Sequence, residues 1–175
     1  MQETSPLLLS VAQLIAEREA RRAQEKEAQE QLAHKEEEDL AKFRMRLDEF
    51  QMTEAYAQTL MQRVRRAFEH GEPELMIVSF PSSFCTDSGR AIENAGEPPI
   101  NKPSKQVAVR SSEPEWLHTL PKGVIPLYEL WRSALRPGGF GFAARIIGYP
   151  GGMPGDLGLF ITWPRSTLED KPSAD

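Results

Sequence analysis

The apolar positions in the first part of the chain follow a helical pattern. Ser5 and Pro6 form a helix start, because Ser caps the first turn and Pro is tolerated at its first position. No further Pro or Gly occurs before Gly71, which predicts the helix end. The pattern predicts one helix, or two closely joined helices, over residues 7–70, roughly 90 Å long at about 1.5 Å per residue. Residues 1–6 are expected to form a disordered start.

Three zones along this predicted helix differ in polarity. Residues 7–15 are an apolar cap, with Leu8, Val11 and Ile15 on one face. Residues 16–39 consist mainly of helix-favouring Ala, Glu, Gln, Arg and Lys, which predicts a charged, solvated spacer. Residues 40–68 resume an apolar stripe at spacings of three and four, typical of a coiled-coil seam. The seam positions we expect to make contacts are Leu40, Phe43, Leu47, Phe50, Met61, Val64 and Phe68.

Two interpretations of the seam remain open: packing on the chain's own C-terminal domain, or association between helices of different chains. Phe at several seam positions fits poorly in a parallel two-stranded coiled coil, and apolar neighbours such as Met45 and Leu60 broaden the stripe. We favour intramolecular packing and keep self-association and a foreign helix as alternatives. The apolar cap, separated from the seam by the spacer, resembles a docking segment for the protein itself or another protein.

The second part of the chain, residues 73–163, reads as a small α+β domain. The order β-α-α-β-β predicts a three-stranded mixed sheet, with the first two strands parallel and the last pairing as a hairpin. A Pro-, Ser- and Lys-rich stretch predicts a mobile surface loop, and the polar end predicts a disordered tail. The expected segments are strand 74–80, helix 88–95, loop 96–115, helix 123–135, strands 140–149 and 156–163, and tail 164–175.

A three-stranded sheet has two faces to cover. The predicted helix 123–135 is amphipathic and can cover one face. The seam of residues 40–68 is expected to cover the other, because a domain of this size would be marginal with one face bare. The sequence therefore predicts an α+β fold with a long, coiled-coil-like N-terminal helix and a sandwich-like small domain.

Composition narrows the function classes. The 175 residues are 39% hydrophobic and 27% charged, with a net charge of −5 that argues against direct binding to nucleic acid. The single cysteine cannot form an internal disulfide, which favours a reducing compartment. No apolar run reaches the roughly 18 residues of a membrane span, and the start lacks the cationic region of a signal peptide. We expect a cytoplasmic protein.

The turn from Pro81 to Arg90 poses the sharpest chemical question. It follows a predicted strand, contains the only cysteine, Cys85, and ends at an arginine where a helix is expected. A cysteine near a helix N-terminus can have a lowered pKa, and Arg90 could clamp an anion. The spacing from Cys85 to Arg90 is one position shorter than a phosphate-binding thiolate loop needs, however, and no His precedes the cysteine. A simple capping turn around a buried cysteine is the competing interpretation.

The glycine-rich loop between the last two strands is a second candidate, through Gly151, Gly152, Gly155 and Asp156. It could let a ligand approach the backbone, or it could be a wide hairpin turn. No metal-ligand spacing and no phosphate-loop motif occur in the sequence, so no metal or cofactor is expected. The leading hypothesis is a non-enzymatic interaction and oligomerisation protein. The alternative is a small enzyme or anion-binding module with Cys85 as nucleophile and Arg90 as anion clamp.

Overall fold

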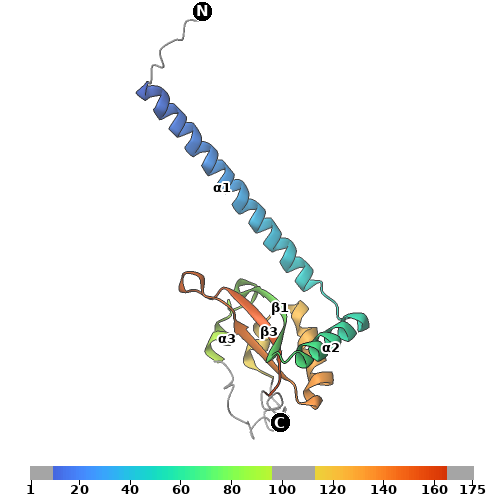
Figure 1. Ribbon diagram of the computed structural model, residues 1–175. Coiled ribbons are helices and arrows are strands. Elements are labelled where there is room, and N and C mark those ends of the chain that lie inside the picture. Colours follow the sequence, from blue (N-terminus) through green and yellow to red (C-terminus); the bar gives the residue numbers. More distant parts are fainter. Residues whose placement is uncertain (1–9, 96–112, 165–175) are drawn as a thin grey trace, which may run out of the picture. The chain divides into compact units, whose positions relative to one another are not determined.

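The computed structural model describes residues 10–95 and 113–164 (Figure 1). The fold is α+β, as predicted: a long N-terminal helix precedes a small domain with helices and a three-stranded sheet. The chain divides into two units, Met1–Met45 and Arg46–Asp175, and each is described by itself. The predictions for Leu8, the start 1–6, loop residues 96–112 and tail residues 165–175 lie outside the described residues.

Helix α1 spans Val11–Asp48, and its residues from Val11 to Lys42 are all exposed. Helix α1 contains many helix-favouring residues and exposed ion pairs one turn apart, Lys26 with Glu30 at 3.7 Å and Lys42 with Glu38 at 3.8 Å. Such pairs contribute only about 0.3–0.5 kcal/mol each. The helix therefore rests on local propensity over most of its length.

Helix α2 spans Glu54–Glu69, so the predicted long helix is two closely joined helices. The break contains neither Gly nor Pro. It is fixed by Thr53, whose hydroxyl accepts a hydrogen bond from the Tyr56 amide at 3.2 Å and so caps α2. The Phe50 and Tyr56 rings meet edge to face across the break, with centroids 4.9 Å apart. The seam predicted over residues 40–68 is consequently interrupted around Phe50.

The end of α1 packs closely against the segment that precedes helix α4 (Ile125–Leu130). A Cβ atom on Gly123 would lie 1.4 Å from the carbonyl oxygen of Leu47, a distance that no side chain can accept. Leu47 is buried at this contact. Gly123 is therefore required by the close approach of two backbones.

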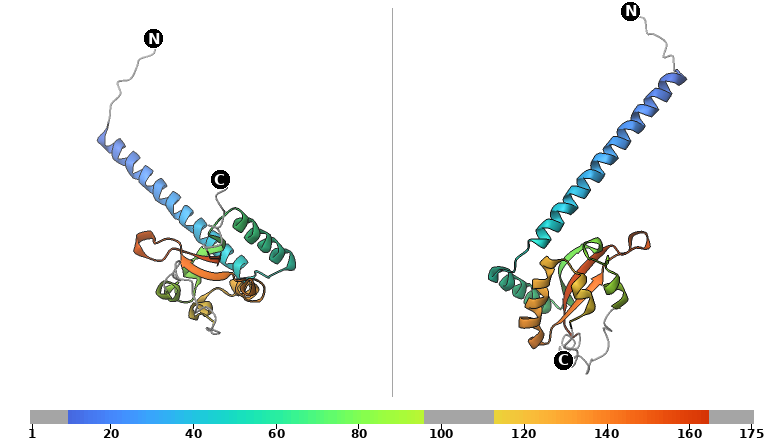
Figure 2. Two further views of the ribbon diagram at one scale, coloured as in Figure 1. Left: turned by 60° about the horizontal axis from the view of Figure 1, so that its bottom comes forward. Right: turned by 180° about the vertical axis from the view of Figure 1, so that it is seen from behind.

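The sheet is antiparallel throughout, and the predicted mixed sheet is wrong. Strands β1 (Glu74–Pro81), β2 (Gly141–Ile146) and β3 (Asp156–Thr162) lie in the order β1-β3-β2, with β3 antiparallel to both neighbours (Figure 2). The predicted hairpin of β2 and β3 does form, but β1 pairs with the other edge of β3. The strand with the strongest apolar alternation thereby becomes the central one.

One face of β3 forms the core of the domain. Leu157, Leu159 and Ile161 are fully buried, and Phe80 of β1 pairs opposite Leu157. Ile146, Ala144 and Phe142 of β2 pair opposite the same three residues and so share this face. The two last strands thus contribute one alternating apolar row each to the core.

Both α2 and α4 reach this same face, so the predicted sandwich is wrong. Phe68 of α2 meets the ring of Trp163, the next residue of the buried β3 row, at 5.8 Å. Tyr128 of α4 meets Phe142 at 5.5 Å. The physical reason is that only one sheet face carries a continuous apolar surface, and both helices bury their apolar sides against it.

On the opposite sheet face, an ion pair covers an aromatic ring. Phe160 lies on this face, with Met76 and Ala143 as its neighbours across the strands. The Arg145 guanidinium lies 4.0 Å from the Phe160 ring centroid and pairs with the Glu74 carboxylate. Arg145 therefore reaches from β2 across β3 to β1, and its side chain shields the aromatic ring from water.

Replacing Gly123 by Ala should destabilise the protein strongly. The added methyl group would overlap the Leu47 carbonyl, so the backbones must move apart, at a cost of about 3 kcal/mol in the free energy of unfolding. Urea denaturation measures this change. Gly148→Ala is the matched control, because no atom lies within 4 Å of its added Cβ. Equal stabilities of the two variants would contradict the close approach.

Removing the Arg145 side chain should also lower stability. Arg145→Ala loses the contact with the Phe160 ring and leaves Glu74, itself mostly buried, without its partner. We expect the free energy of unfolding to fall by about 1–2 kcal/mol. Lys42→Ala removes an exposed ion pair and serves as the control, with an expected change below about 0.5 kcal/mol. Thermal denaturation distinguishes them, and a loss no larger than that of the control contradicts the shielding role.

Candidate functional site

The turn after β1 is bonded to the body of the domain. The Cys85 amide donates to the Ser82 carbonyl at 3.0 Å, and the Thr86 amide donates to the Thr119 carbonyl at 2.9 Å. Helix α3 then begins at Arg90 and runs to Ala95. The turn is thus a fixed connection between β1 and α3.

Asp87 already fills the position where an anion would bind in this turn. Its carboxylate accepts hydrogen bonds from the Gly89 amide at 3.0 Å and from the Ala91 amide at 2.7 Å. The Ser88 and Arg90 amides donate to carbonyls within the turn, at 3.2 and 3.4 Å. An incoming anion would have to displace a carboxylate from these amides, so the contacts favour a self-capped turn.

Cys85 is poorly suited to act as a nucleophile. It is only 4% exposed. Burial, and secondly the nearby Asp87 carboxylate, raise the pKa of the Cys85 thiol to about 11. The thiol is therefore protonated at neutral pH, whereas the reactive form is the thiolate. Arg90 is exposed, and no interaction joins its side chain to Cys85 in the part of the chain that the structure describes.

The glycine-rich loop is a hairpin turn that is bonded back to Ser82. The Ser82 amide donates to the Gly155 carbonyl and its hydroxyl donates to the Pro154 carbonyl, both at 2.9 Å. Gly151 and Gly152 have φ angles of 61° and 80°, which favour glycine. A Cβ on Gly155 would lie 2.7 Å from the Pro150 ring. Turn geometry thus accounts for the three glycines, and Asp156 is exposed at the start of β3.

The predicted interaction residues divide between the two units. In the second unit, Leu47 and Val64 are buried, Phe50 and Met61 are half-buried, and Phe68 is partly exposed against Trp163. Leu60, which the sequence analysis noted only as a neighbour of the seam, is buried beside Val64, and so is Ala67, which the seam left out. The helical spacing could have shown this, since Leu60, Val64 and Ala67 are four and three residues apart. The break before Thr53 separates this stripe from the seam of α1.

In the first unit, the predicted residues do not share a core. Val11, Ile15 and Leu40 are exposed, and Phe43 is half-buried. Three further large apolar residues, Leu14, Leu32 and Met45, are exposed on the same helix. The exposed apolar side chains of α1 therefore remain open to solvent within the described part of the chain.

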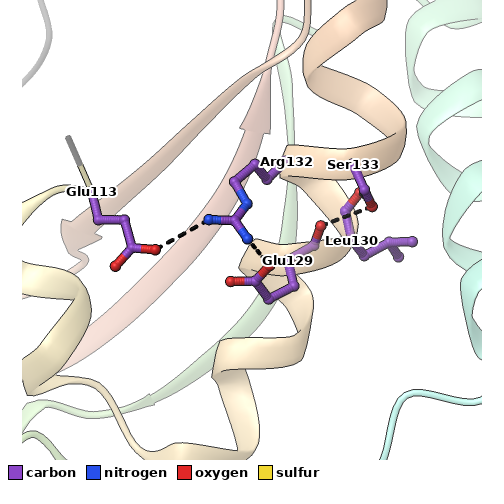
Figure 3. Close-up of polar contacts among 5 residues, drawn as sticks. All are labelled: Glu113, Glu129, Leu130, Arg132 and Ser133. Atoms are coloured by element: carbon purple, nitrogen blue, oxygen red, sulfur yellow. Dashed lines mark hydrogen bonds and ion pairs between the residues drawn. The ribbon is translucent and has the colours of Figure 1, made fainter. Parts of the chain in front are cut away.

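A polar cluster stabilises an irregular turn after α4. The predicted helix 123–135 is instead the short α4 followed by a π-helical turn, Trp131–Leu135. The Ser133 hydroxyl donates to the Glu129 carbonyl at 2.9 Å, which competes with regular helical bonding (Figure 3). Arg132 pairs with Glu129 at 2.6 Å and with Glu113 at 3.1 Å (Figure 3). Both carboxylates are already paired with Arg132, so we interpret this cluster as stabilising the turn rather than as a binding site.

Other site types were searched for within residues 10–95 and 113–164. No group of three or more His, Cys, Asp or Glu side chains in these ranges could hold a metal ion. No described helix combines the length and apolarity that crossing a membrane requires. Comparisons with protein families, with curated proteins and with solved structures gave no match. Function must therefore be argued from the residues of this chain.

The Cys85 thiol should be unreactive in the folded protein. We expect alkylation by iodoacetamide, followed by mass spectrometry, to be slow at neutral pH and to accelerate only as the pH approaches about 11. Since the folded pKa lies above the ordinary 9.0, the contribution to stability is present below pH 9.0 and is lost as the pH rises toward 11. Urea-unfolded protein is the control and should react readily. A reaction midpoint below 9.0 in the folded chain would contradict the buried thiol.

Proposed function

We propose that the protein is a non-enzymatic, cytoplasmic interaction protein. Its helix α1 docks to a second copy or to another protein, and the small α+β domain is the folded platform that carries the helix. The contacts of Cys85 and Asp87 do not favour the enzymatic alternative, because the thiol is protonated and the turn amides are already bonded.

The observation that carries this proposal is the exposed apolar surface of α1. Ile15 is 45% exposed, Leu40 is 47% exposed and Leu32 is 58% exposed, although all three are side chains that favour burial. Burying one such side chain completely contributes about 1.5–3 kcal/mol. Val11, Leu14 and Ile15 are exposed at i, i+3 and i+4 spacing and so adjoin on one side of the helix. Contiguous exposed apolar groups of this kind are typical of a surface that another protein covers.

The second unit has a buried core, which a folded platform for α1 requires. Its apolar residues are gathered on one face of the sheet, where Leu157, Leu159 and Ile161 are fully buried. The last turn of α1 belongs to this unit and is fixed by the approach of Leu47 to Gly123. Helix α1 is continuous from Val11 to Asp48, and its C-terminal residues are part of the folded second unit.

Charges placed on the apolar end of α1 should abolish the association. We expect the double variant Leu14→Glu, Ile15→Glu to lose assembly or partner binding, because it converts two exposed apolar groups to carboxylates. Light scattering of the full chain over a wide concentration range measures self-assembly. Affinity capture with wild type and variant, followed by mass spectrometry, measures partner binding.

The matched control is Ala16→Glu, Ala20→Glu, which adds the same charge to the other side of the same exposed helix segment. This control should assemble or bind as the wild type does. A wild-type chain that stays monomeric and captures no protein dependent on Leu14 and Ile15 would contradict the proposed function.

A further inference from the structure

The exposed apolar patch near the N-terminal end of α1 continues into a basic patch on the same side of the helix. Val11, Leu14 and Ile15 are 72%, 44% and 45% exposed. Seven residues are close to two helical turns, so the positions seven residues further on lie on the same side. All three of these positions are exposed arginines: Arg18, Arg21 and Arg22. We call the six residues together the N-terminal stripe of α1.

The acidic side chains of this segment border the N-terminal stripe without interrupting it. Between Val11 and Arg22 the acidic residues are Glu17 and Glu19. On a helix they fall on opposite sides of the line that joins the three apolar residues to the three arginines. The stripe is therefore apolar at its N-terminal end and basic at its C-terminal end.

The three arginines of the stripe make no ion pair and no side-chain hydrogen bond with any other residue that the structure describes. Arg21 has glutamates four residues away on both sides, and it pairs with neither. Lys26 and Lys42 of the same helix, in contrast, each pair with a glutamate one turn away. The guanidinium groups of the stripe can therefore bind carboxylates of another molecule, which they hold in a planar, bidentate geometry.

We propose that the segment Val11–Arg22 docks as a helix into an apolar groove of another protein, and that Asp or Glu side chains border the groove where the arginines lie. This inference rests on the proposed function and gives the chemistry of its partner. A helix that binds in a groove is recognised through anchors at positions i, i+3, i+4 and i+7. Val11, Leu14, Ile15 and Arg18 have this spacing.

The charges favour an acidic protein groove over other acceptors. An anionic membrane or a nucleic acid attracts a protein through its summed charge. Acidic residues outnumber basic ones in α1, and the whole chain has a net charge of −5, so the summed charge opposes this attraction. A parallel second copy of α1 would place the three arginines against the same three arginines, which repel. Carboxylates at the edge of a groove can meet the arginines one by one at short range.

Calcium-loaded calmodulin is a suitable probe for this chemistry. It is an acidic protein that opens a methionine-rich apolar groove when it binds Ca²⁺, and the groove closes when the Ca²⁺ is removed. We expect the full chain to bind calmodulin in Ca²⁺ and to lose this binding in EGTA, as measured by isothermal titration calorimetry. The EGTA experiment keeps the acidic protein and removes only the open groove.

Variants of the full chain separate the two parts of the stripe. Leu14→Glu with Ile15→Glu should weaken the binding about 100-fold or more, because carboxylates would replace two apolar anchors. Arg18→Glu with Arg22→Glu should weaken it at least about tenfold, because attraction by the carboxylates becomes repulsion. All four positions are exposed, so neither change disturbs the buried core.

The matched control for the arginine variant is Lys35→Glu with Lys42→Glu. It makes the same change in net charge on the same exposed helix. Lys35 is roughly 20 Å from Arg22 along the helix axis, which exceeds the Debye length of about 8–10 Å at physiological salt. The control should bind calmodulin as the wild type does.

Three results with calmodulin would overturn the inference. The absence of Ca²⁺-dependent binding by the wild type would refute the groove. Wild-type affinity in the arginine variant would refute the acidic border, and equal losses in the arginine and lysine variants would show attraction by net charge alone. The proposed function would survive each of these results if assembly or capture still depends on Leu14 and Ile15.

Two further measurements test the other acceptors directly. The wild type should not sediment with vesicles of equimolar phosphatidylserine and phosphatidylcholine, and it should be monomeric by light scattering. Sedimentation that the Leu14→Glu, Ile15→Glu variant abolishes would assign the stripe to a lipid surface. A wild-type dimer that the same variant dissociates would assign the stripe to a second copy, and either result would overturn the inference.

Discussion

The structure of the second unit depends on the burial of one face of β3. Leu157, Leu159 and Ile161 are fully buried, and both neighbouring strands pair with β3 so that their own apolar residues join the same row. A central strand that is apolar on one face gives the small domain a single large surface to cover. Hydrophobic burial then brings α2 and α4 to the same side of the sheet. On the remaining face, among the described residues, Arg145 lies over Phe160 and shields it.

This arrangement explains why the long helix is interrupted. Leu60, Val64 and Ala67 of α2 are buried in the core, whereas α1 ends at Asp48 and α2 begins only at Glu54. The interruption is fixed by the Thr53 cap and by the contact of Leu47 with Gly123, without any glycine or proline in the break itself. The core of the second unit thereby uses the C-terminal half of the apolar stripe. The exposed residues Val11, Ile15 and Leu40 contribute nothing to it.

The sequence was sufficient where a local pattern decides the structure. The end of the helical region near Gly71, the alternation of β3 and the apolar face of the segment after Gly123 are each determined by residues close together in the chain. The strand order was predicted wrongly because pairing of β1 with β3 joins residues far apart in sequence, such as Phe80 and Leu157. The cover of the second sheet face was missed for the same reason, since Glu74 and Arg145 meet only in the folded domain.

The candidate site illustrates a further limit of sequence reasoning. Cys85, Asp87 and Arg90 suggest an anion site when they are read as a string of residue types. The direction of the Asp87 carboxylate decides whether the turn can bind an anion. It accepts hydrogen bonds from the Gly89 and Ala91 amides and so occupies the place of an anion. No spacing rule distinguishes an aspartate that caps its own turn from one that leaves the amides free.

Helix α1 shows the opposite case, in which the fold adds meaning to the sequence. Its charged middle reads as a solvated spacer, and such a composition keeps an isolated helix stable and soluble in water. The structure leaves Val11, Leu14 and Ile15 exposed near the N-terminal end of this helix, at i, i+3 and i+4 spacing, so the three side chains adjoin. A charged helix with a short apolar patch near one end can remain soluble and still present one surface that favours burial.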